Sequence, residues 1–301
     1  MDIRSLEVFL GLSEELHFGR AAEKLAMGQS TVSEHIRRLE TRIGKRLFER
    51  SSRKVTLTTT GEILAQRLRD PLQSIQIALR EAAKEHSPHQ QKLRIGFLGG
   101  GFYELYEPLI RRHQSTWPLV DLEFVESSYS TQFSAIEDGE VDLAFCRLPV
   151  SSDRLEAGPI IMSDPRVVCV NESHPLAKQN FIDAEELRGE TMLSVSAAHA
   201  GKKWQEYHFP LSTPDGYPLK LGPTIRTVRE GVSAVIAGHG IFFLTKRAAQ
   251  YFATPRMSVV EVNLPPIHSA LVWRRGDTRS ILAAFNQTLL EVANENLESF
   301  N

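Results

Sequence analysis

The stretch AMGQSTVSEHIRRLE, residues 26–40, decides how the N-terminal part of the chain folds. Its apolar residues Val32, Ile36 and Leu39, continued by Ile43, recur at steps of four, three and four, which is the period of an amphipathic helix. A shorter periodic segment precedes it, and Gly28 lies in the turn between the two. Two short helices joined by a turn with glycine, the second polar and basic on its outer face, are typical of a helix-turn-helix.

The outer face of this predicted helix carries side chains that suit DNA. A helix in the major groove contacts base edges with the side chains at its N-terminal end, and basic side chains neutralise phosphates. The charge is local: residues 28–54 hold eight Lys and Arg against three Glu, although the whole chain has a formal net charge of −2. A solvated face of a small bundle would have a similar charge, but the order of turn, polar tip, basic helix and basic hairpin at 47–58 favours DNA. The predicted DNA contacts are Gln29, Ser30, Thr31, Ser33, Glu34, Arg37, Arg38, Arg53 and Lys54.

A long helix is predicted after the hairpin, as a linker over residues 59–90. Thr59 and Glu62 have the spacing of a capping box, and Pro71 is expected to kink or weaken the helix. Near-heptad apolar steps favour pairing with a second copy of the helix. The predicted dimerisation seam is Leu64, Leu68, Leu72, Ile75 and Leu79.

From residue 91 onward, strand and helix patterns alternate. The order strand, helix, strand, helix, strand over residues 93–147 predicts a parallel sheet covered by helices, so the fold class is α/β with an N-terminal, all-α winged helix-turn-helix. A second set of strands and helices follows, which predicts two subdomains with a cleft between them. The domain limits are 1–58, 59–90 and 91–301, with subdomain one at 91–162 and 268–301 and subdomain two at 163–267.

Several motifs resemble the LysR-type transcriptional regulators. The dense matches are LEVFL (6–10), HFGRAAEKLAMGQSTVSEHIRRLE (17–40), GKRLFER (44–50) and LTTTGE (57–62), with looser matches at GEVDLAF (139–145) and VIAGHGIFFL (235–244). The resemblance implies a winged helix-turn-helix, a linker helix and an effector-binding domain similar to periplasmic binding proteins. It also implies a homo-oligomer, a tetramer built from two dimers, on an interrupted palindromic operator, with RNA polymerase as a further candidate partner.

Two residues depart from the pattern of the family. Gly28 stands where many members carry Ser, which gives a weaker N-cap. Glu34 stands where many carry Arg, on the face expected to meet DNA. A carboxylate there is repelled by phosphate but accepts a hydrogen bond from a cytosine amine, so the DNA-binding role is expected but the operator preference of the family does not carry over.

The effector is expected beyond the carboxyl ends of the strands, where α/β sheets bind ligands. Glycine turns and hydroxyls offer donors there, and Arg147 offers a fork that suits a carboxylate, although a salt bridge to a nearby acid is an alternative role. The resemblance to family members that sense small acids favours a small organic anion. The predicted effector contacts are Gly99, Gly100, Gly101, Ser128, Tyr129, Arg147, Ser196 and Thr227.

Other classes of function have weaker support. The segment GFLGGGF (96–102) lacks the GxGxxG and P-loop spacings, and no catalytic or metal-ligand order stands out, so no enzyme activity, cofactor or metal is expected. An enzyme domain with an appended basic helix stays as an alternative. Redox sensing by Cys146 and Cys169 is another, although each fits a buried strand as a small hydrophobe. Two cysteines, no signal peptide and no membrane-length apolar run predict a cytoplasmic protein that does not enter a membrane.

Overall fold

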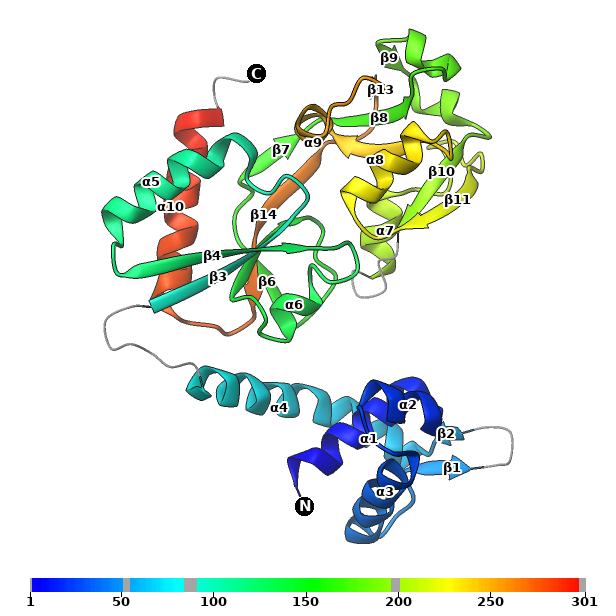
Figure 1. Ribbon diagram of the computed structural model, residues 1–301, viewed down its shortest axis with the longest axis vertical. Coiled ribbons are helices and arrows are strands. Elements are labelled where there is room, and N and C mark those ends of the chain that lie inside the picture. The colour runs from blue at the N-terminus through cyan, green and yellow to red at the C-terminus, as the bar shows by residue number, and fades with distance from the viewer. Residues whose placement is uncertain (1, 51–54, 84–90, 196–200, 298–301) are drawn as a thin grey trace. The chain divides into compact units, whose positions relative to one another are not determined.

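The computed structural model describes residues 2–50, 55–83, 91–195 and 201–297, which form two compact units, Met1–Glu85 and His86–Asn301 (Figure 1). The first unit is helical with one small hairpin. Its elements are α1 (Ile3–Glu15), α2 (Phe18–Lys24), α3 (Gln29–Ile43), β1 (Phe48–Arg50), β2 (Val55–Leu57) and α4 (Thr59–Ala83).

The periodic stripe of α3 lies in the core of the first unit. Val32, Ile36 and Leu39 are buried against α1 and α2, as the sequence predicted, whereas Ile43 at the end of the helix is exposed. The helix ends at Gly44, whose φ of +75° is a conformation that favours glycine. The core continues into the hairpin, where the rings of Phe9 and Phe48 lie 5.6 Å apart. The stripe therefore fixes which face of α3 points outward.

The start of α4 differs from the predicted capping box. The helix begins at Thr59, but its cap is Thr58, whose hydroxyl accepts the Gly61 N–H at 3.0 Å and donates to the Arg46 carbonyl at 2.8 Å. Gly61 is required by space, because a Cβ there would lie 2.2 Å from the Leu47 carbonyl oxygen. The helix runs on through Pro71 to Ala83.

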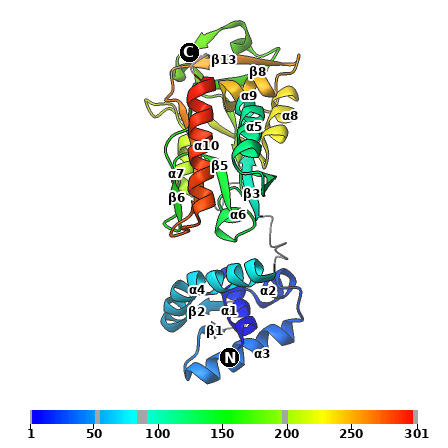
Figure 2. The same cartoon turned by 90° about the vertical axis from the view of Figure 1, so that its left-hand side faces the viewer.

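The larger sheet of the second unit has the strand order β4-β3-β5-β14-β6, with β7 also paired to β14. β3 is parallel to β4 and β5, as the sequence predicted, and β14 is antiparallel to β5. Helices α5 and α10 lie side by side and pack on this sheet (Figures 1 and 2). Its elements are β3 (Gln91–Leu98), η1 (Tyr103–Leu105), α5 (Tyr106–Thr116), β4 (Val120–Ser127), α6 (Ser134–Glu137), β5 (Leu143–Arg147), β6 (Leu155–Ala157), β7 (Met162–Asp164), β14 (Ile267–Arg274) and α10 (Ser280–Leu297).

The rest of the second unit is built on a mixed sheet, β12-β8-β13-β9, and on the parallel pair β10-β11. In the mixed sheet β8 is antiparallel to β12 and β13, so the second set of strands does not repeat the parallel order of the first. Its elements are β8 (Arg166–Asn171), η2 (Pro175–Lys178), β9 (Phe181–Ile182), η3 (Ala184–Leu187), β10 (Thr191–Val195), α7 (Lys202–His208), β11 (Lys220–Ile225), α8 (Val228–Ile236), β12 (Phe242–Thr245), α9 (Lys246–Tyr251) and β13 (Met257–Val262).

One hydrophobic cluster spans both sheets of the second unit. It joins Tyr129 and Phe133, which follow β4, to Trp204 and Phe209 at α7 and to Phe242 in β12. The rings of Tyr129 and Phe209 meet edge to face with centroids 5.5 Å apart. The two subdomains therefore share apolar core and are packed together in this structure.

His208 lies in this cluster with its Nε2 2.9 Å from the Leu148 carbonyl oxygen and its ring 4.3 Å from that of Trp204. Burial, with smaller effects of Arg147 and Arg166, lowers the pKa of His208 well below 6.5. The folded unit therefore keeps this ring neutral, while the unfolded chain takes up a proton as the pH falls below 6.5. Unfolding then becomes easier in acid.

We expect His208 to lower the free energy of unfolding by about 1.4 kcal/mol for each pH unit below 6.5. In His208→Gln this part of the pH dependence should be missing, since Gln does not titrate. The measurement is urea unfolding followed by tryptophan fluorescence, because all three tryptophans of the chain lie in the second unit. His239→Gln, at an exposed histidine, is the control. Equal pH slopes in wild type and His208→Gln would contradict the assignment.

Candidate nucleic-acid interface and inter-subdomain cavity

The N-terminal tip of α3 presents polar groups outward. Its N-cap is Gly28, with φ −72° and ψ 144°, and no side chain caps the first turn. Gln29, Ser30 and Thr31 are exposed, and Ser33 is half-buried one turn further on. The backbone N–H groups of an uncapped first turn, together with amide and hydroxyl side chains, suit phosphates and base edges.

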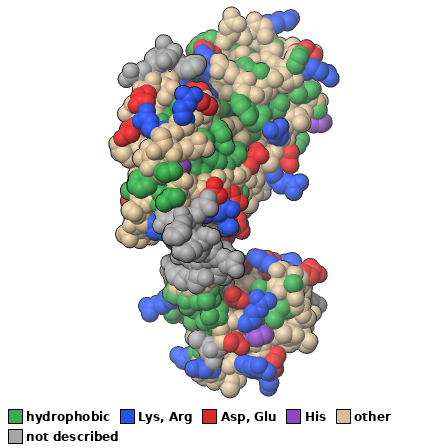
Figure 3. All heavy atoms as spheres, turned by 60° about the vertical axis from the view of Figure 1, so that its left-hand side comes forward, with side chains coloured by type: hydrophobic (Ala, Val, Ile, Leu, Met, Phe, Trp, Pro, Cys, Tyr) green, Lys and Arg blue, Asp and Glu red, His purple; other side chains and the backbone are tan. Residues whose placement is uncertain are grey.

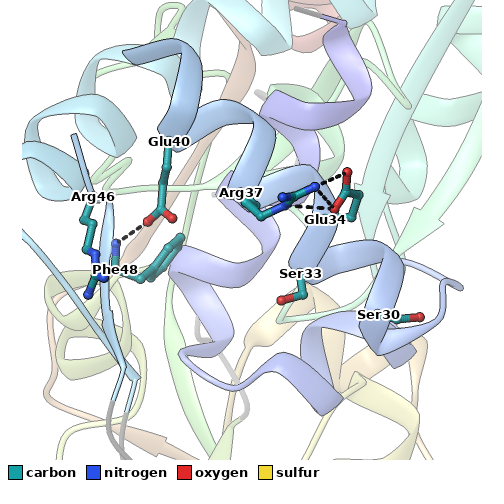
Figure 4. Close-up of a pocket in the computed structure, with 7 residues that line it drawn as sticks. All are labelled: Ser30, Ser33, Glu34, Arg37, Glu40, Arg46 and Phe48. Atoms are coloured by element: carbon teal, nitrogen blue, oxygen red, sulfur yellow. Dashed lines mark hydrogen bonds and ion pairs between the residues drawn. The ribbon is translucent and has the colours of Figure 1, made fainter. Parts of the chain in front are cut away.

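The basic body of α3 is partly neutralised by Glu34. Arg37 reaches its carboxylate with two N–H groups, both at 3.1 Å (Figure 4). Arg38 donates to the same carboxylate at 2.8 Å. These bonds lower the pKa of Glu34. The bond from Arg38 has the largest effect, and the bond from Arg37 the next largest. The face of the first unit in Figure 3 likewise mixes acidic and basic side chains. In this arrangement two arginines share one carboxylate, which weakens their pull on phosphate.

A second glutamate, Glu40, fixes the hairpin beside α3. Its carboxylate accepts the backbone N–H of Phe48 at 3.2 Å (Figure 4) and that of Leu47 at 2.8 Å. An open pocket of about 510 Å³ lies between helix and hairpin, and it is lined by Ser30, Ser33, Glu34, Arg37, Glu40, Arg46 and Phe48. The predicted contacts at the tip of the hairpin, Arg53 and Lys54, lie outside the described residues.

The structure divides the predicted dimerisation seam of α4 into two parts. Leu72 is 4% exposed in the core of its own unit, and Leu64 and Leu68 pack against the same core. Ile75 and Leu79 are 42% and 57% exposed. The first part of the seam therefore holds α4 onto the winged helix within one chain, and only the second part offers apolar surface to another copy.

In the second unit a small cavity lies where the two subdomains meet. Its volume is about 10 Å³, room for about one water molecule. β3, β5, β7 and β14 contribute to it from one side and the end of β12 from the other. The lining residues are Leu98, Gly101, Tyr103, Phe145, Arg147, Met162, Asp164, Thr245 and Ser269.

Arg147 is the cation of this cavity. It is the last residue of β5 and only 7% exposed, and its carbonyl accepts the Trp204 indole N–H at 2.9 Å. Its guanidinium lies 3.5 Å from the Tyr103 phenol oxygen and makes no ion pair with any carboxylate of the described residues. The salt bridge considered as its alternative role is therefore not formed here. A buried guanidinium keeps its charge, because arginine does not give up its proton in proteins, and a partner anion stabilises it strongly.

Another arginine pairs with Asp164, the acid of the cavity lining, and with Glu104, which lies outside that lining. Arg247 in α9 donates to Glu104 at 2.6 Å and lies 3.6 Å from the Asp164 carboxylate. Burial raises the pKa of Asp164, and the charges of Arg247 and Arg147 partly offset that effect. Neither carboxylate oxygen of Asp164 has a hydrogen-bond partner among the described residues. Since Glu104 follows β3 and Arg247 follows β12, this ion pair joins the two subdomains.

Of the predicted effector contacts, Gly101 and Arg147 line the cavity. A Cβ on Gly99 would lie 2.9 Å from Val228 of subdomain two, and one on Gly100 would lie 2.2 Å from the Tyr103 ring. The glycine turn therefore allows close approach of neighbouring groups, with φ of +62° at both Gly99 and Gly101.

The other predicted contacts lie elsewhere. The Thr227 hydroxyl caps α8 by accepting the Glu230 N–H at 3.1 Å, and the Ser128 hydroxyl lies 2.9 Å from that of Ser130. Tyr129 is completely buried, its phenol has no hydrogen-bond partner among the described residues, and burial raises its pKa. Ser196 lies outside the described residues.

Sequence reasoning missed four polar members of the cavity, Tyr103, Asp164, Thr245 and Ser269. Tyr103 sits in a turn at φ +48°, which no periodicity predicts. Asp164 and Ser269 lie on the antiparallel pair β7 and β14, which was not expected to border the cleft. Thr245 ends β12 and caps α9, so the strand-end rule that selected Arg147 would also have selected it.

Both cysteines are buried and unpaired, Cys146 in β5 and Cys169 in β8. Burial raises the pKa of both thiols, that of Cys169 to about 12. A thiol in this state is a poor nucleophile, because the thiolate is the reactive form. The described residues contain no helix that is both long and apolar enough to cross a bilayer, and among them no group of three or more His, Cys, Asp and Glu is placed to hold a metal ion.

Two family models match the chain. The model described as "LysR substrate binding domain" matches residues 86–294, and "Bacterial regulatory helix-turn-helix protein, lysR family" matches residues 3–62. The HTH-type transcriptional regulator AlsR of Bacillus subtilis is 34% identical over 252 residues, which are 84% of this chain and 83% of AlsR. The DNA-binding transcriptional dual regulator OxyR of Escherichia coli is 30% identical over 200 residues, 66% of this chain and 65% of OxyR.

Solved structures agree with the fold. Full-length BenM matches with a TM-score of 0.54 and 24% identity, over 100% of this chain and 99% of BenM. CbnR, a LysR family transcriptional regulator, matches with a TM-score of 0.58 and 16% identity, over 97% of this chain and 99% of CbnR. At these identities the likeness concerns the fold alone, a winged helix-turn-helix with an α/β domain.

Replacing Glu34 by Gln should free both arginines for phosphate. We expect tighter binding to a random-sequence duplex and a steeper salt dependence, by up to about one unit of slope for each arginine released. The measurement is fluorescence anisotropy of the full-length protein over a series of KCl concentrations. Glu107→Gln, which breaks an equivalent pair with Arg111 in the second unit, is the control. Equal slopes for the two variants would mean that Glu34 does not restrain DNA binding.

Replacing Leu79 by Glu should weaken self-association while leaving the first unit folded, because this side chain is exposed in the single chain. Gln66→Glu adds the same charge at another exposed position of α4 and serves as the control. Sedimentation equilibrium gives the mass, and circular dichroism the fold. Leu72→Glu does not test the same point, since it places a charge in the core. A Leu79→Glu protein of wild-type mass would exclude this part of α4 as an interface.

Proposed function

The chain belongs to the LysR family of DNA-binding transcriptional regulators, and we propose that a small organic anion held by Arg147 in the inter-subdomain cavity controls it. The observation that carries the proposal is the buried guanidinium without an ion-pair partner among the described residues. Removing such a charge from water costs several kcal/mol, and a carboxylate with two parallel N–H···O bonds offsets much of that cost.

The size of the cavity adds a condition to this proposal. A space for about one water molecule does not hold an organic acid, so binding requires the groups around Arg147 to move apart. The Glu104–Arg247 ion pair and the shared aromatic cluster hold the subdomains together in this structure. An effector that separates them shifts the population between two arrangements of the second unit, by as much as its affinity differs between them.

For the DNA-binding unit we propose the exposed tip of α3 as the reading element. Gln29 offers a bidentate amide to adenine, Ser30, Thr31 and Ser33 offer hydroxyls, and the arginines of α3 bind phosphates. The buried stripe on the opposite face supports this, because it leaves this tip as the outward end of α3. Arg53 and Lys54 are proposed phosphate contacts on the grounds of sequence alone.

We further propose that two copies pair through the exposed end of α4 and read the two halves of an interrupted palindrome. Ile75 and Leu79 supply the apolar surface. A tetramer and a contact with RNA polymerase are implied by the family resemblance.

Redox sensing, the alternative raised by Cys146 and Cys169, has less support. OxyR is among the relatives, but both thiols are buried and burial raises their pKa values, which opposes formation of the thiolate. The geometry around Arg147 therefore favours an anion effector over cysteine chemistry.

Arg147→Gln should abolish the response to the effector and leave DNA binding unchanged. A panel of mono- and dicarboxylic acids is first tested for an increase in thermal stability of the wild type, since a ligand at a hundredfold excess over its Kd adds about 2.7 kcal/mol. Each acid that stabilises the wild type is then tested on the variant. DNA binding is measured on a duplex selected by the wild type from a random library.

Arg154→Gln is the control for the loss of a cation, because Arg154 pairs with Glu137 outside the cavity. An acid that stabilises wild type and Arg147→Gln equally would refute the placement at Arg147. Failure of every acid on the wild type would count against an organic-anion effector.

A further inference from the structure

Tyr103 differs from the other residues around Arg147 in its backbone. Its φ of +48° lies in the left-handed region, which an aromatic residue rarely adopts because of steric strain. Strain of this kind persists only where neighbouring contacts hold it. At Tyr103 these contacts position the phenol at the cavity.

The ring of Tyr103 occupies a slot that the glycine turn leaves open. A Cβ on Gly100 would lie 2.2 Å from the Tyr103 Cε1 and 2.8 Å from its Cδ1, so no other residue type at position 100 leaves room for the ring. The ring packs against the core of the larger sheet and also against the cluster shared by both subdomains. Any effector that reaches Arg147 through this slot must displace the ring.

The phenol provides Arg147 with a weak partner. The distance from Nη2 to the phenol oxygen is 3.5 Å, at the long limit of a hydrogen bond, and the partner is a hydroxyl rather than a carboxylate. A carboxylate gives a charge-assisted bond of about 2.7–2.9 Å, roughly twice as strong as a neutral one. The present partner is therefore easily replaced by an anion.

The Tyr103 ring also contacts an exposed residue of subdomain two. It meets Tyr251 of α9 edge to face, with centroids 5.9 Å apart, and Tyr251 is 60% exposed. Displacement of the Tyr103 ring therefore changes a contact between the turn of subdomain one and α9 of subdomain two.

We propose that Tyr103 is an internal plug of the anion site. Its phenol contacts the guanidinium of Arg147 until the carboxylate of an effector takes the place of the phenol and displaces the ring. This rests on the proposed function, because it assumes that Arg147 binds the effector. It adds that the affinity of the site is set by the strength of the plug. If the plugged form makes up about 90–99% of the molecules, removal of the Tyr103 ring tightens binding of an anion at Arg147 about 10- to 100-fold.

Sodium acetate is the probe, compared with sodium chloride at constant ionic strength. Its binding to the full-length protein is measured by calorimetry and by tryptophan fluorescence, to which Trp204, the donor to the Arg147 carbonyl, contributes. Tyr103→Gly removes both ring and strain and should bind acetate about 10- to 100-fold more tightly than wild type. Tyr103→Phe keeps the ring and removes only the hydroxyl, so a gain of a few-fold is expected.

Tyr106→Phe, at an exposed tyrosine three residues further on, is the matched control and should leave acetate binding unchanged. The double variant Tyr103→Gly/Arg147→Gln should lose the gain completely. If Tyr103→Gly does not fold, the acetate affinity of Tyr103→Phe still tests the proposal.

The outcomes separate the plug from the proposed function. If an acid binds wild type in an Arg147-dependent way while neither Tyr103 variant gains affinity for acetate, the plug is wrong and the effector site stands. If the Tyr103 variants gain affinity and Arg147→Gln does not reverse it, the anion binds elsewhere and both proposals fail. A gain that depends on Arg147 supports the plug.

Discussion

A buried positive charge constrains the second unit more than any other single feature. Arg147 ends a central strand, so its backbone is fixed by the sheet, and the Trp204 indole bonded to its carbonyl ties subdomain two to the same point. The guanidinium cannot give up its proton, and water reaches only a small part of it. The neighbouring groups must therefore compensate the charge, and Tyr103 does so with one long hydrogen bond. The proposed ligand class follows from this charge.

The first unit shows a different balance between charge and geometry. The stripe of Val32, Ile36 and Leu39 fixes the rotation of α3, and Glu40 fixes the hairpin beside it. With the scaffold set in this way, Glu34 determines how strongly the outer face attracts phosphate. Exposed ion pairs contribute little to stability. The same pairs matter for DNA, because charges that are satisfied within the protein release fewer counterions on binding.

The sequence predicted some features well and others in part. The helix-turn-helix and the parallel order of β3, β4 and β5 could be predicted from the sequence, because both depend on short-range periodicity. The seam of α4 was predicted as one surface, yet Leu72 packs inside its own chain and Leu79 is exposed. Apolar spacing on a helix states which residues share a face, and it does not state what covers that face. The strand-end rule located Arg147 but not Tyr103, which lies in a turn, and not Asp164, which ends β7, a strand that was not predicted.

The sequence by itself determined the identity of the domains, the outward face of α3 and the one cation at the end of β5, since each is encoded in local pattern or in a dense family motif. The tertiary structure alone decided which polar groups meet around that cation. These groups come from separate parts of the chain: Tyr103 from a turn, Asp164 from β7 and Thr245 from the end of β12. No spacing along the chain relates them. Their association results from the packing of two sheets on a shared aromatic core, which is a property of the folded surfaces and not of any segment.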